Sequence, residues 1–155
     1  MSQKYRKGIG IFLLNEKNKL WVGKRIDHKN KYWQMPQGGI DDLESPLNAM
    51  KRELFEETGL KGSYEVIGKT SKWLTYNLPR DIVNVVWDGK FIGQKQIWFA
   101  CRFKGEDDQI DINRFKNPEF CEWMWIDPSE ILKLVVPFKK KLYIKVLSQF
   151  KSFII

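Results

Sequence analysis

Three glutamates, Glu53, Glu56 and Glu57, lie three and four residues apart in a stretch with a helical pattern of apolar residues. At about 100° per residue, their carboxylates emerge within roughly 100° of arc on one helical face. Carboxylates this close repel one another, so the protein must compensate with solvent, cationic side chains or a metal ion. The two interpretations are a solvated acidic face and a site for a hard divalent cation, which takes oxygen ligands.

The helix that must carry these glutamates has clear start and stop signals. Ser45 is suited to cap the first turn and Pro46 to occupy the first helical position. Gly59 can adopt the left-handed conformation that ends a helix. The sequence therefore predicts a helix from Pro46 to Thr58. We expect its core-facing stripe to consist of Leu47, Met50, Leu54 and Thr58, with Phe55 extending it.

The rest of the chain alternates short apolar runs with turn-forming residues, which predicts a mixed sheet with helices against its faces. Strands are predicted over residues 7–14, 20–25, 64–70, 73–78, 94–103 and 119–126. The last of these is expected to be buried on both faces, and residues 20–25 to pair with the first strand. Residues 80–90 are ambiguous, with a strand-like core at 82–87. Helices are predicted over residues 128–134 and 138–153.

The stretch from Gly38 to Leu60 follows the pattern G-x5-E-x7-R-E-U-x-E-E-x-G-U, where U is a bulky aliphatic residue. In this pattern the chain resembles the Nudix hydrolases, which hydrolyse diphosphates linked to another moiety. The resemblance implies an α/β/α sandwich of the α+β type with a mixed central sheet. It also implies one domain over residues 1–155, with the Nudix box at 38–60.

The same resemblance implies roles for the residues of the box. Mg²⁺, or another divalent cation such as Mn²⁺, is expected to be held by the side chains of Glu53, Glu56 and Glu57 and by the carbonyl of Gly38. Two further residues of the box are expected to be structural. Arg52 lies outside the acidic arc and would orient a glutamate, and Glu44 would favour the positive helix end or pair with Arg52.

Segments outside the box resemble a narrower branch, which contains bacterial RNA pyrophosphohydrolases and asymmetric dinucleoside tetraphosphate hydrolases. These segments are residues 5–6, 33–39, 73–79, 93–96, 118–120 and 138–139. In that branch the glutamate of the Pro-Glu-Phe segment joins the metal site, which adds Glu119 to the catalytic set. Contacts to phosphate or base are expected from Arg6, Arg25 and Lys139, and stacking on a base from Tyr76 or Phe138. The lysine-rich loop 26–32 is longer than the branch leads us to expect.

Composition limits the class of protein. The 155 residues are 43% hydrophobic and 30% charged, typical of a folded domain, and a net charge of +8 favours polyanionic partners. Cys101 and Cys121 lie in apolar surroundings and are expected to be core thiols in a reducing compartment. The N-terminal apolar run is too short for a secretion signal, and no stretch is long enough for a membrane span. We expect a cytoplasmic protein.

The functional expectation is an RNA 5′-pyrophosphohydrolase that converts 5′-triphosphorylated ends to monophosphates and so promotes mRNA decay. Glu57 and Glu53 are both candidates for the general base. One alternative is the hydrolysis of dinucleoside polyphosphates such as diadenosine tetraphosphate. Another is a non-catalytic RNA- or nucleotide-binding module. A membrane-surface role has little support, because Lys139, Lys140 and Lys141 form a run and not a helical stripe.

Overall fold

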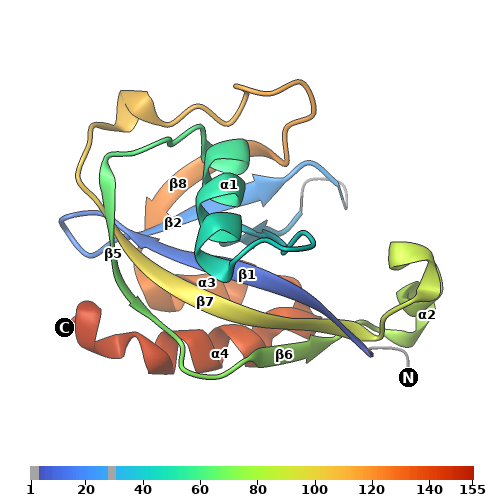
Figure 1. Ribbon diagram of the computed structural model, residues 1–155. Coiled ribbons are helices and arrows are strands. Elements are labelled where there is room, and N and C mark those ends of the chain that lie inside the picture. The colour runs from blue at the N-terminus through green and yellow to red at the C-terminus, as the bar shows by residue number, and fades with distance from the viewer. Residues whose placement is uncertain (1–3, 28–30) are drawn as a thin grey trace.

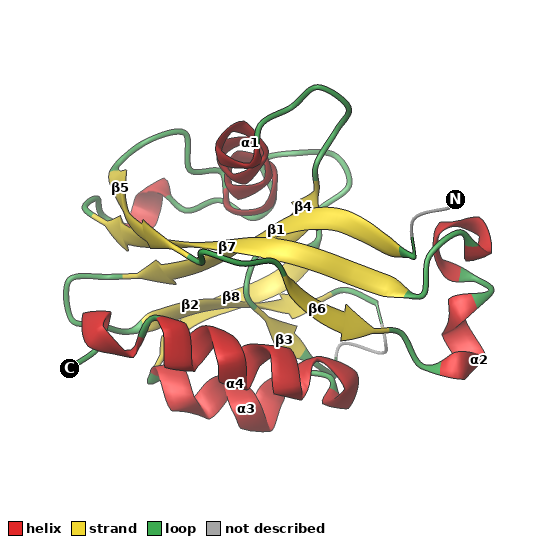
Figure 2. Cartoon of the chain, turned by 60° about the horizontal axis from the view of Figure 1, so that its bottom comes forward, coloured by secondary structure: helices red, strands yellow, loops and turns green. Residues whose placement is uncertain are grey.

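The protein folds into a mixed β-sheet that has helices packed on both of its faces (Figures 1 and 2). The computed structural model describes residues 4–27 and 31–155. The described strands form one eight-stranded sheet. They are β1 (Tyr5–Leu14), β2 (Leu20–Arg25), β3 (Trp33–Gln34), β4 (Gln37–Gly39), β5 (Tyr64–Lys69), β6 (Leu74–Asn77), β7 (Gly93–Phe103) and β8 (Phe120–Ile126).

The helices divide between the two faces of the sheet, with α1 on one and α3 and α4 on the other (Figure 2). The α-helices are α1 (Pro46–Thr58), α2 (Arg80–Val83), α3 (Ile131–Leu134) and α4 (Lys140–Gln149). The 3₁₀ helices are η2 (Val86–Gly89), η3 (Asp107–Gln109), η4 (Pro128–Glu130), η5 (Pro137–Lys139) and η6 (Lys151–Phe153). The expected α+β architecture with a mixed central sheet is confirmed.

The long strands β1 and β7 form the centre of the sheet and run parallel over ten paired positions. β2 contacts β1 at only one pair, Leu14 and Leu20, and makes its main ladder with β8. The expected pairing of residues 20–25 with the first strand is therefore correct at one position only. The branching of the sheet leaves room between α1 and α4 for a cavity.

The two faces of the sheet carry separate hydrophobic cores. In β1, Ile11 and Leu13 pack toward α1, whereas Phe12 and Leu14 pack toward α3 and α4. Because successive strand residues point to opposite faces, the unbroken apolar run of β1 serves both cores. Trp98 on β7 is fully buried in the core that α4 covers.

The predicted bounds of α1 are confirmed. The hydroxyl of Ser45 accepts a hydrogen bond from the backbone N–H of Asn48 at 3.1 Å, and Gly59 ends the helix at φ 78°. Met50, Leu54 and Thr58 are buried as expected. Leu47 shares their arc but is 39% exposed, so its placement in the core was wrong; it lies in the first turn, outside the cluster that Met50 and Leu54 join.

Three other predictions need correction. Residues 82–87, the strand-like core of the ambiguous segment, form no strand: β7 is already paired with β1, β5 and β6, and this segment folds into α2 and η2. β8 is not buried on both faces; only Phe120 is fully buried in this strand. Cys121 is consequently exposed, whereas Cys101 is a core thiol as predicted. β8 pairs with β2 alone, which leaves its other edge without a strand among the described residues.

The C-terminal region follows the prediction with interruptions. Residues 128–134 form η4 and α3, and residues 137–153 form η5, α4 and η6 in succession, so the single helix predicted over 138–153 is broken into three. No helix among residues 4–27 and 31–155 is long and apolar enough to cross a membrane. His28, the single histidine, is predicted from its Lys- and Asn-rich surroundings to be a solvated loop side chain, and it lies outside the described residues. The assignment of residues 1–155 to one domain stays a prediction.

Candidate active site

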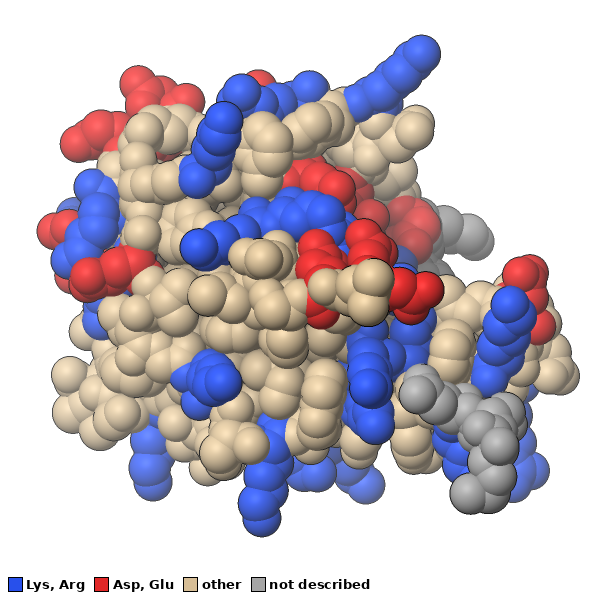
Figure 3. All heavy atoms as spheres, viewed as in Figure 1, with Lys and Arg blue, Asp and Glu red and all other residues tan. Residues whose placement is uncertain are grey.

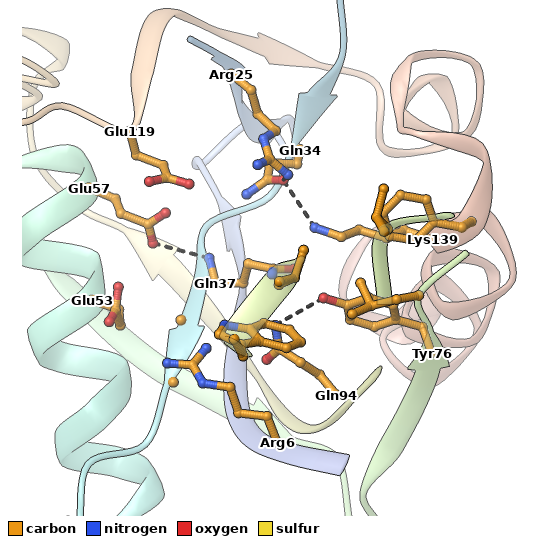
Figure 4. A pocket seen from close by; sticks show the side chains of 17 residues that line it. Arg6, Arg25, Gln34, Gln37, Glu53, Glu57, Tyr76, Gln94, Glu119 and Lys139 are labelled. Atoms are coloured by element: carbon orange, nitrogen blue, oxygen red, sulfur yellow. Dashed lines mark hydrogen bonds between the residues drawn. The ribbon is translucent and has the colours of Figure 1, made fainter. Parts of the chain in front are cut away.

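A cavity of about 370 Å³ opens between α1, the strands β1, β4 and β7, and the segment that leads into α4 (Figure 4). Its walls combine carboxylates, cations, amides and aromatic rings. The lining residues are Arg6, Arg25, Gln34, Gln37, Gly38, Gly39, Glu53, Glu57, Tyr76, Leu78, Ile82, Val86, Trp87, Gln94, Glu119, Phe138 and Lys139.

The acidic wall brings together residues that are far apart in the sequence. Glu53 and Glu57 project from α1, and Glu119 projects from the loop before β8 (Figure 4). Glu57 is only 5% exposed, and one of its oxygens accepts a hydrogen bond from the backbone N–H of Gln37 at 3.1 Å. Its other oxygen, Oε1, is buried and has no hydrogen-bond partner.

Burial of these carboxylates disfavours their charged forms. It raises the pKa of Glu57 well above the ordinary value, and the nearby charges of Glu53 and Glu119 raise it further. Burial also raises the pKa of Glu53 to about 7, although Arg52 opposes the change. A bound cation would favour the charged forms of these buried carboxylates.

Gly38 makes room for the Glu53 carboxylate. It lies opposite Ile9 in the ladder of β1 and β4, and a β-carbon built on it would lie 2.0 Å from the Glu53 carboxyl carbon. Contacts this short are not tolerated, so position 38 has to be glycine for the carboxylate to occupy this place.

Arg52 holds the back of the acidic wall. Its guanidinium donates to Glu44 from Nε and Nη2, each at 2.9 Å, and to Glu53 from Nη1 at 2.7 Å. Nη2 also donates to the carbonyl of Gly39 at 2.9 Å. These bonds to Arg52 lower the pKa of Glu44 to about 2. Glu56 does not line the cavity; one of its oxygens lies 3.4 Å from Nη1 of Arg52.

The opposite wall is basic. The side chain of Lys139 is buried and donates to Oε1 of Gln34 at 3.2 Å, the same oxygen that accepts from Nη1 of Arg25 at 3.2 Å (Figure 4). Burial, together with the charge of Arg25, lowers the pKa of Lys139 to about 7. Arg25 also forms an ion pair with Asp27. Cations gathered in this way suit the binding of phosphate groups.

Aromatic rings and amides complete the cavity. The Arg6 guanidinium lies 5.1 Å from the centre of the Trp87 ring and packs against Gly39. The hydroxyl of Tyr76 accepts a hydrogen bond from Nε2 of Gln94 at 2.9 Å.

The centre of the Tyr76 ring lies 6.0 Å from the centre of the Phe138 ring. Planar surfaces of this kind can stack on a nucleobase.

Nine of the twelve site residues predicted from the sequence line this cavity. They are Arg6, Arg25, Gly38, Glu53, Glu57, Tyr76, Glu119, Phe138 and Lys139. Glu44 and Arg52 support the cavity from behind, and Glu56 lies beside them. Their chemical roles stay predictions.

Several lining residues were not predicted from the sequence, among them Gln34, Gln37, Gln94 and Trp87. A signal was present for Gln94, because it begins a predicted apolar strand and a polar side chain there needs a partner. Trp87 carried no such signal, since it lies in the segment 80–90, whose structure the sequence leaves ambiguous.

The acidic wall provides oxygen donors suited to a divalent cation such as Mg²⁺. Oε1 of buried Glu57 fits such a cation, because a buried carboxylate oxygen ordinarily has a partner and this one has none. Within the described part of the chain, however, no three His, Cys, Asp or Glu side chains are already gathered as a metal site. The residues therefore fit a cation by their chemistry, and binding would draw the carboxylates together.

Comparison with known proteins gives consistent results. The NUDIX domain family matches residues 4–146. The chain is 47% identical over 150 residues to the RNA pyrophosphohydrolase of Rickettsia bellii (strain OSU 85-389), covering 97% of this chain and 92% of that protein. It is 49% identical over 138 residues to the RNA pyrophosphohydrolase of Pelagibacter ubique (strain HTCC1062), covering 89% and 86%.

Solved structures share the fold at low sequence identity. The E. coli dihydroneopterin triphosphate pyrophosphohydrolase superposes with a TM-score of 0.71 at 18% identity, covering 93% of this chain and 97% of that chain. A binary complex of the C. elegans Ap4A hydrolase has a TM-score of 0.68 at 16% identity, covering 95% and 98%.

Proposed function

The chain belongs to the NUDIX domain family, and from this premise we propose that it is an RNA pyrophosphohydrolase. It is a hydrolase of phosphoric anhydride bonds. Its substrate would be RNA with a 5′-triphosphate, and its products a 5′-monophosphate end and pyrophosphate. The RNA pyrophosphohydrolases that resemble it over nearly the whole chain support this assignment. The proposal includes a cytoplasmic location and a role in mRNA decay.

The single observation that carries the proposal is the pairing of an acidic and a basic wall across one cavity. A 5′-triphosphate needs cationic side chains for its oxygens, which Arg6, Arg25 and Lys139 provide. The first bases need flat apolar surfaces, and the rings of Tyr76 and Phe138 line the same cavity as these cations.

Mg²⁺ is the proposed cofactor, with Mn²⁺ as the alternative, since Nudix hydrolases generally use divalent cations. Glu53, Glu57 and Glu119 would hold it together with the Gly38 carbonyl, and Glu56 would join them from the Arg52 side. When bound, the cation would neutralise charge on the phosphate oxygens and the leaving pyrophosphate.

The protein residues would prepare water for attack. Water adds to a phosphorus of the anhydride bond between the first and second phosphates, that bond breaks, and pyrophosphate leaves. A glutamate accepts the water proton as general base, with Glu57 and Glu53 as the candidates. The backbone N–H of Gln37 fixes one oxygen of Glu57, and the other oxygen stays available for a ligand or a proton. Arg52 holds Glu53 in a similar way from behind.

The second candidate function is hydrolysis of dinucleoside polyphosphates such as diadenosine tetraphosphate, which the same cations and rings could bind. The test supplies both substrates at equal concentration with Mg²⁺ and compares kcat/KM. A clear preference for triphosphorylated RNA supports the proposal, and a clear preference for diadenosine tetraphosphate would replace it.

A non-catalytic RNA- or nucleotide-binding module is the alternative of another class. It predicts that Glu56→Gln and Glu57→Gln behave like the wild type and that added Mg²⁺ changes nothing. The proposal predicts loss of hydrolysis in both variants and a strict need for a divalent cation. The exposed-residue variant Glu16→Gln provides the matched control.

A further inference from the structure

A second cavity of about 370 Å³ adjoins the active site and has no part in the chemistry described above. It lies between β6 and α4, two elements that pack side by side (Figures 1 and 2). We call it the Lys141 groove. Its lining residues are Tyr5, Thr75, Tyr76, Asn77, Phe138, Lys141, Leu142 and Lys145.

The Lys141 groove lies next to the active-site cavity. Tyr76 and Phe138 line both, so one pair of rings forms the shared wall. The hydroxyl of Tyr76 is bonded to Gln94 inside the active site, which fixes the ring in this wall. A chain that leaves the active site past Tyr76 and Phe138 would therefore reach the groove next.

The charge of the groove suits a polyanion. None of the described residues that line it is Asp or Glu, and Lys141 and Lys145 are one helical turn apart on α4, both exposed. The flanking sequence extends this property. Residues 66–80 and 131–155 contain no acidic residue, and the second of these segments holds six lysines. In Figure 3 the lower edge of the molecule, where β6 and α4 lie in Figure 1, shows Lys and Arg and no acid on the visible face.

The groove also offers surfaces that a nucleic acid uses beyond its phosphates. Tyr5 donates a hydrogen bond from its hydroxyl to Oδ1 of Asn77 at 2.8 Å, which places a ring and an amide along one side. Thr75 contributes a hydroxyl, and rings interleaved with lysines are typical of sites that bind single-stranded nucleic acid.

Another cavity beside the active site is less suitable for RNA. A cavity that shares Arg6 with the active site is lined by three acids, Asp41, Asp42 and Glu44, and by two cations, Arg6 and Lys7. Its acids outnumber its cations, whereas the Lys141 groove has two lysines and no acid. Charge thus favours the β6 side for a chain that leaves the active site.

We propose that the Lys141 groove binds the RNA nucleotides that follow those held in the active site, through Lys141 and Lys145 on the backbone phosphates and Tyr5 beside a base. This inference rests on the proposed function. It adds a subsite that would distinguish RNA from dinucleoside polyphosphates, because only RNA continues past the first nucleotides. No covalent step is involved.

The test compares two triphosphorylated substrates, the dinucleotide pppApG and an unstructured octanucleotide that begins with the same two nucleotides. The variant Lys141→Ala/Lys145→Ala removes the cations of the groove. The control variant Lys140→Ala/Lys151→Ala removes the same charge from exposed residues that do not line it. Each protein is assayed on both RNAs over a range of salt concentrations.

We expect the groove variant to raise KM for the octanucleotide by roughly tenfold, with kcat unchanged and kinetics on pppApG unchanged. The slope of log(kcat/KM) against log salt concentration for the octanucleotide should become shallower by about 0.7 for each RNA phosphate that the variant no longer neutralises. The control variant should behave like the wild type on both RNAs.

Two results would overturn the assignment of the groove while leaving the proposed function intact. One is equal kcat/KM of the wild type for the two RNAs, and the other is an equal loss in the groove and control variants. Failure of the proposed function has a separate signature: the wild type would hydrolyse neither RNA while hydrolysing diadenosine tetraphosphate, and the groove assignment would fall with it.

Discussion

The carboxyl group of Glu53, on α1, occupies the space where a side chain at Gly38, on β4, would begin. A β-carbon at position 38 would lie 2.0 Å from the carboxyl carbon and 2.4 Å from each oxygen. The glycine that opens the sequence motif therefore decides where one of its glutamates can lie.

Replacing this glycine should damage activity more than stability. In Gly38→Ala the Glu53 carboxylate, at the end of a flexible side chain, must move, which should change the free energy of unfolding little but lower kcat by on the order of a hundredfold. Urea denaturation and steady-state hydrolysis measure the two effects. The matched control is Gly62→Ala, since a β-carbon at position 62 has no neighbour within 4 Å. Equal behaviour of the two variants would contradict the contact.

A divalent cation should stabilise the protein through Glu57. The raised pKa values of Glu57 and Glu53 mean that the folded state binds more protons than the unfolded state above about pH 4.5. Without a cation, these groups should make stability fall as pH rises from about 4.5 to about 7 and beyond. At pH 8, Mg²⁺ at a hundred times its Kd should restore about 2.7 kcal/mol, seen as a rise in Tm.

The variant Glu57→Gln separates this effect from general salt effects. It should unfold at a higher Tm than the wild type in the absence of cations, because it removes a buried charge. Its response to Mg²⁺ should be weaker. Glu16→Gln, at an exposed turn, should respond like the wild type. An undiminished Mg²⁺ response in Glu57→Gln would exclude this residue as a ligand.

Lys139 should impose an opposite pH dependence. Its pKa of about 7 lies below the ordinary value of a lysine in the unfolded chain, so the unfolded state binds more protons between pH 7 and about 10.5. The destabilisation caused by this buried lysine is greatest below pH 7. It disappears as pH rises from 7 to about 10.5. Lys139→Met should therefore raise Tm at pH 6 and have little effect near pH 10.5.

The gain should be on the order of a few kcal/mol, since a tenfold change in proton affinity corresponds to about 1.4 kcal/mol. The same variant should raise KM for triphosphorylated RNA, because one cation of the basic wall is removed. Lys140→Met, at an exposed neighbouring position, should change neither property. A gain in Tm that is the same at both pH values would show that packing, not charge, is responsible.

The bond between Arg52 and Glu44 should contribute to acid stability. Arg52 holds the pKa of Glu44 at about 2, below its value in the unfolded chain. The contribution is present above about pH 4.5 and is lost as pH falls toward 2. Because solvent screens this pair near the surface, its size should be about 1 kcal/mol or less. Glu44→Gln should therefore lower stability at pH 6 and converge with the wild type near pH 2, as followed by urea denaturation.

Much of the active site could be predicted from local sequence. The spacing of Glu53 and Glu57 depends only on helical geometry, and the ends of α1 depend on Ser45 and Gly59 within the same segment. The apolar runs of β1 and β7 likewise identified the central strands. Each of these inferences needs information from neighbouring residues alone.

Only the tertiary structure decided the environments of those residues. The sequence places Glu56 and Glu57 side by side, yet packing buries Glu57 under the Gln37 amide and leaves Glu56 outside the cavity beside Arg52. The packing of α4 on the sheet decides two further properties. It produces the burial that lowers the pKa of Lys139, and it places the Lys141 groove next to the active site. Desolvation and charge coupling act through space between distant segments, so no local pattern encodes them.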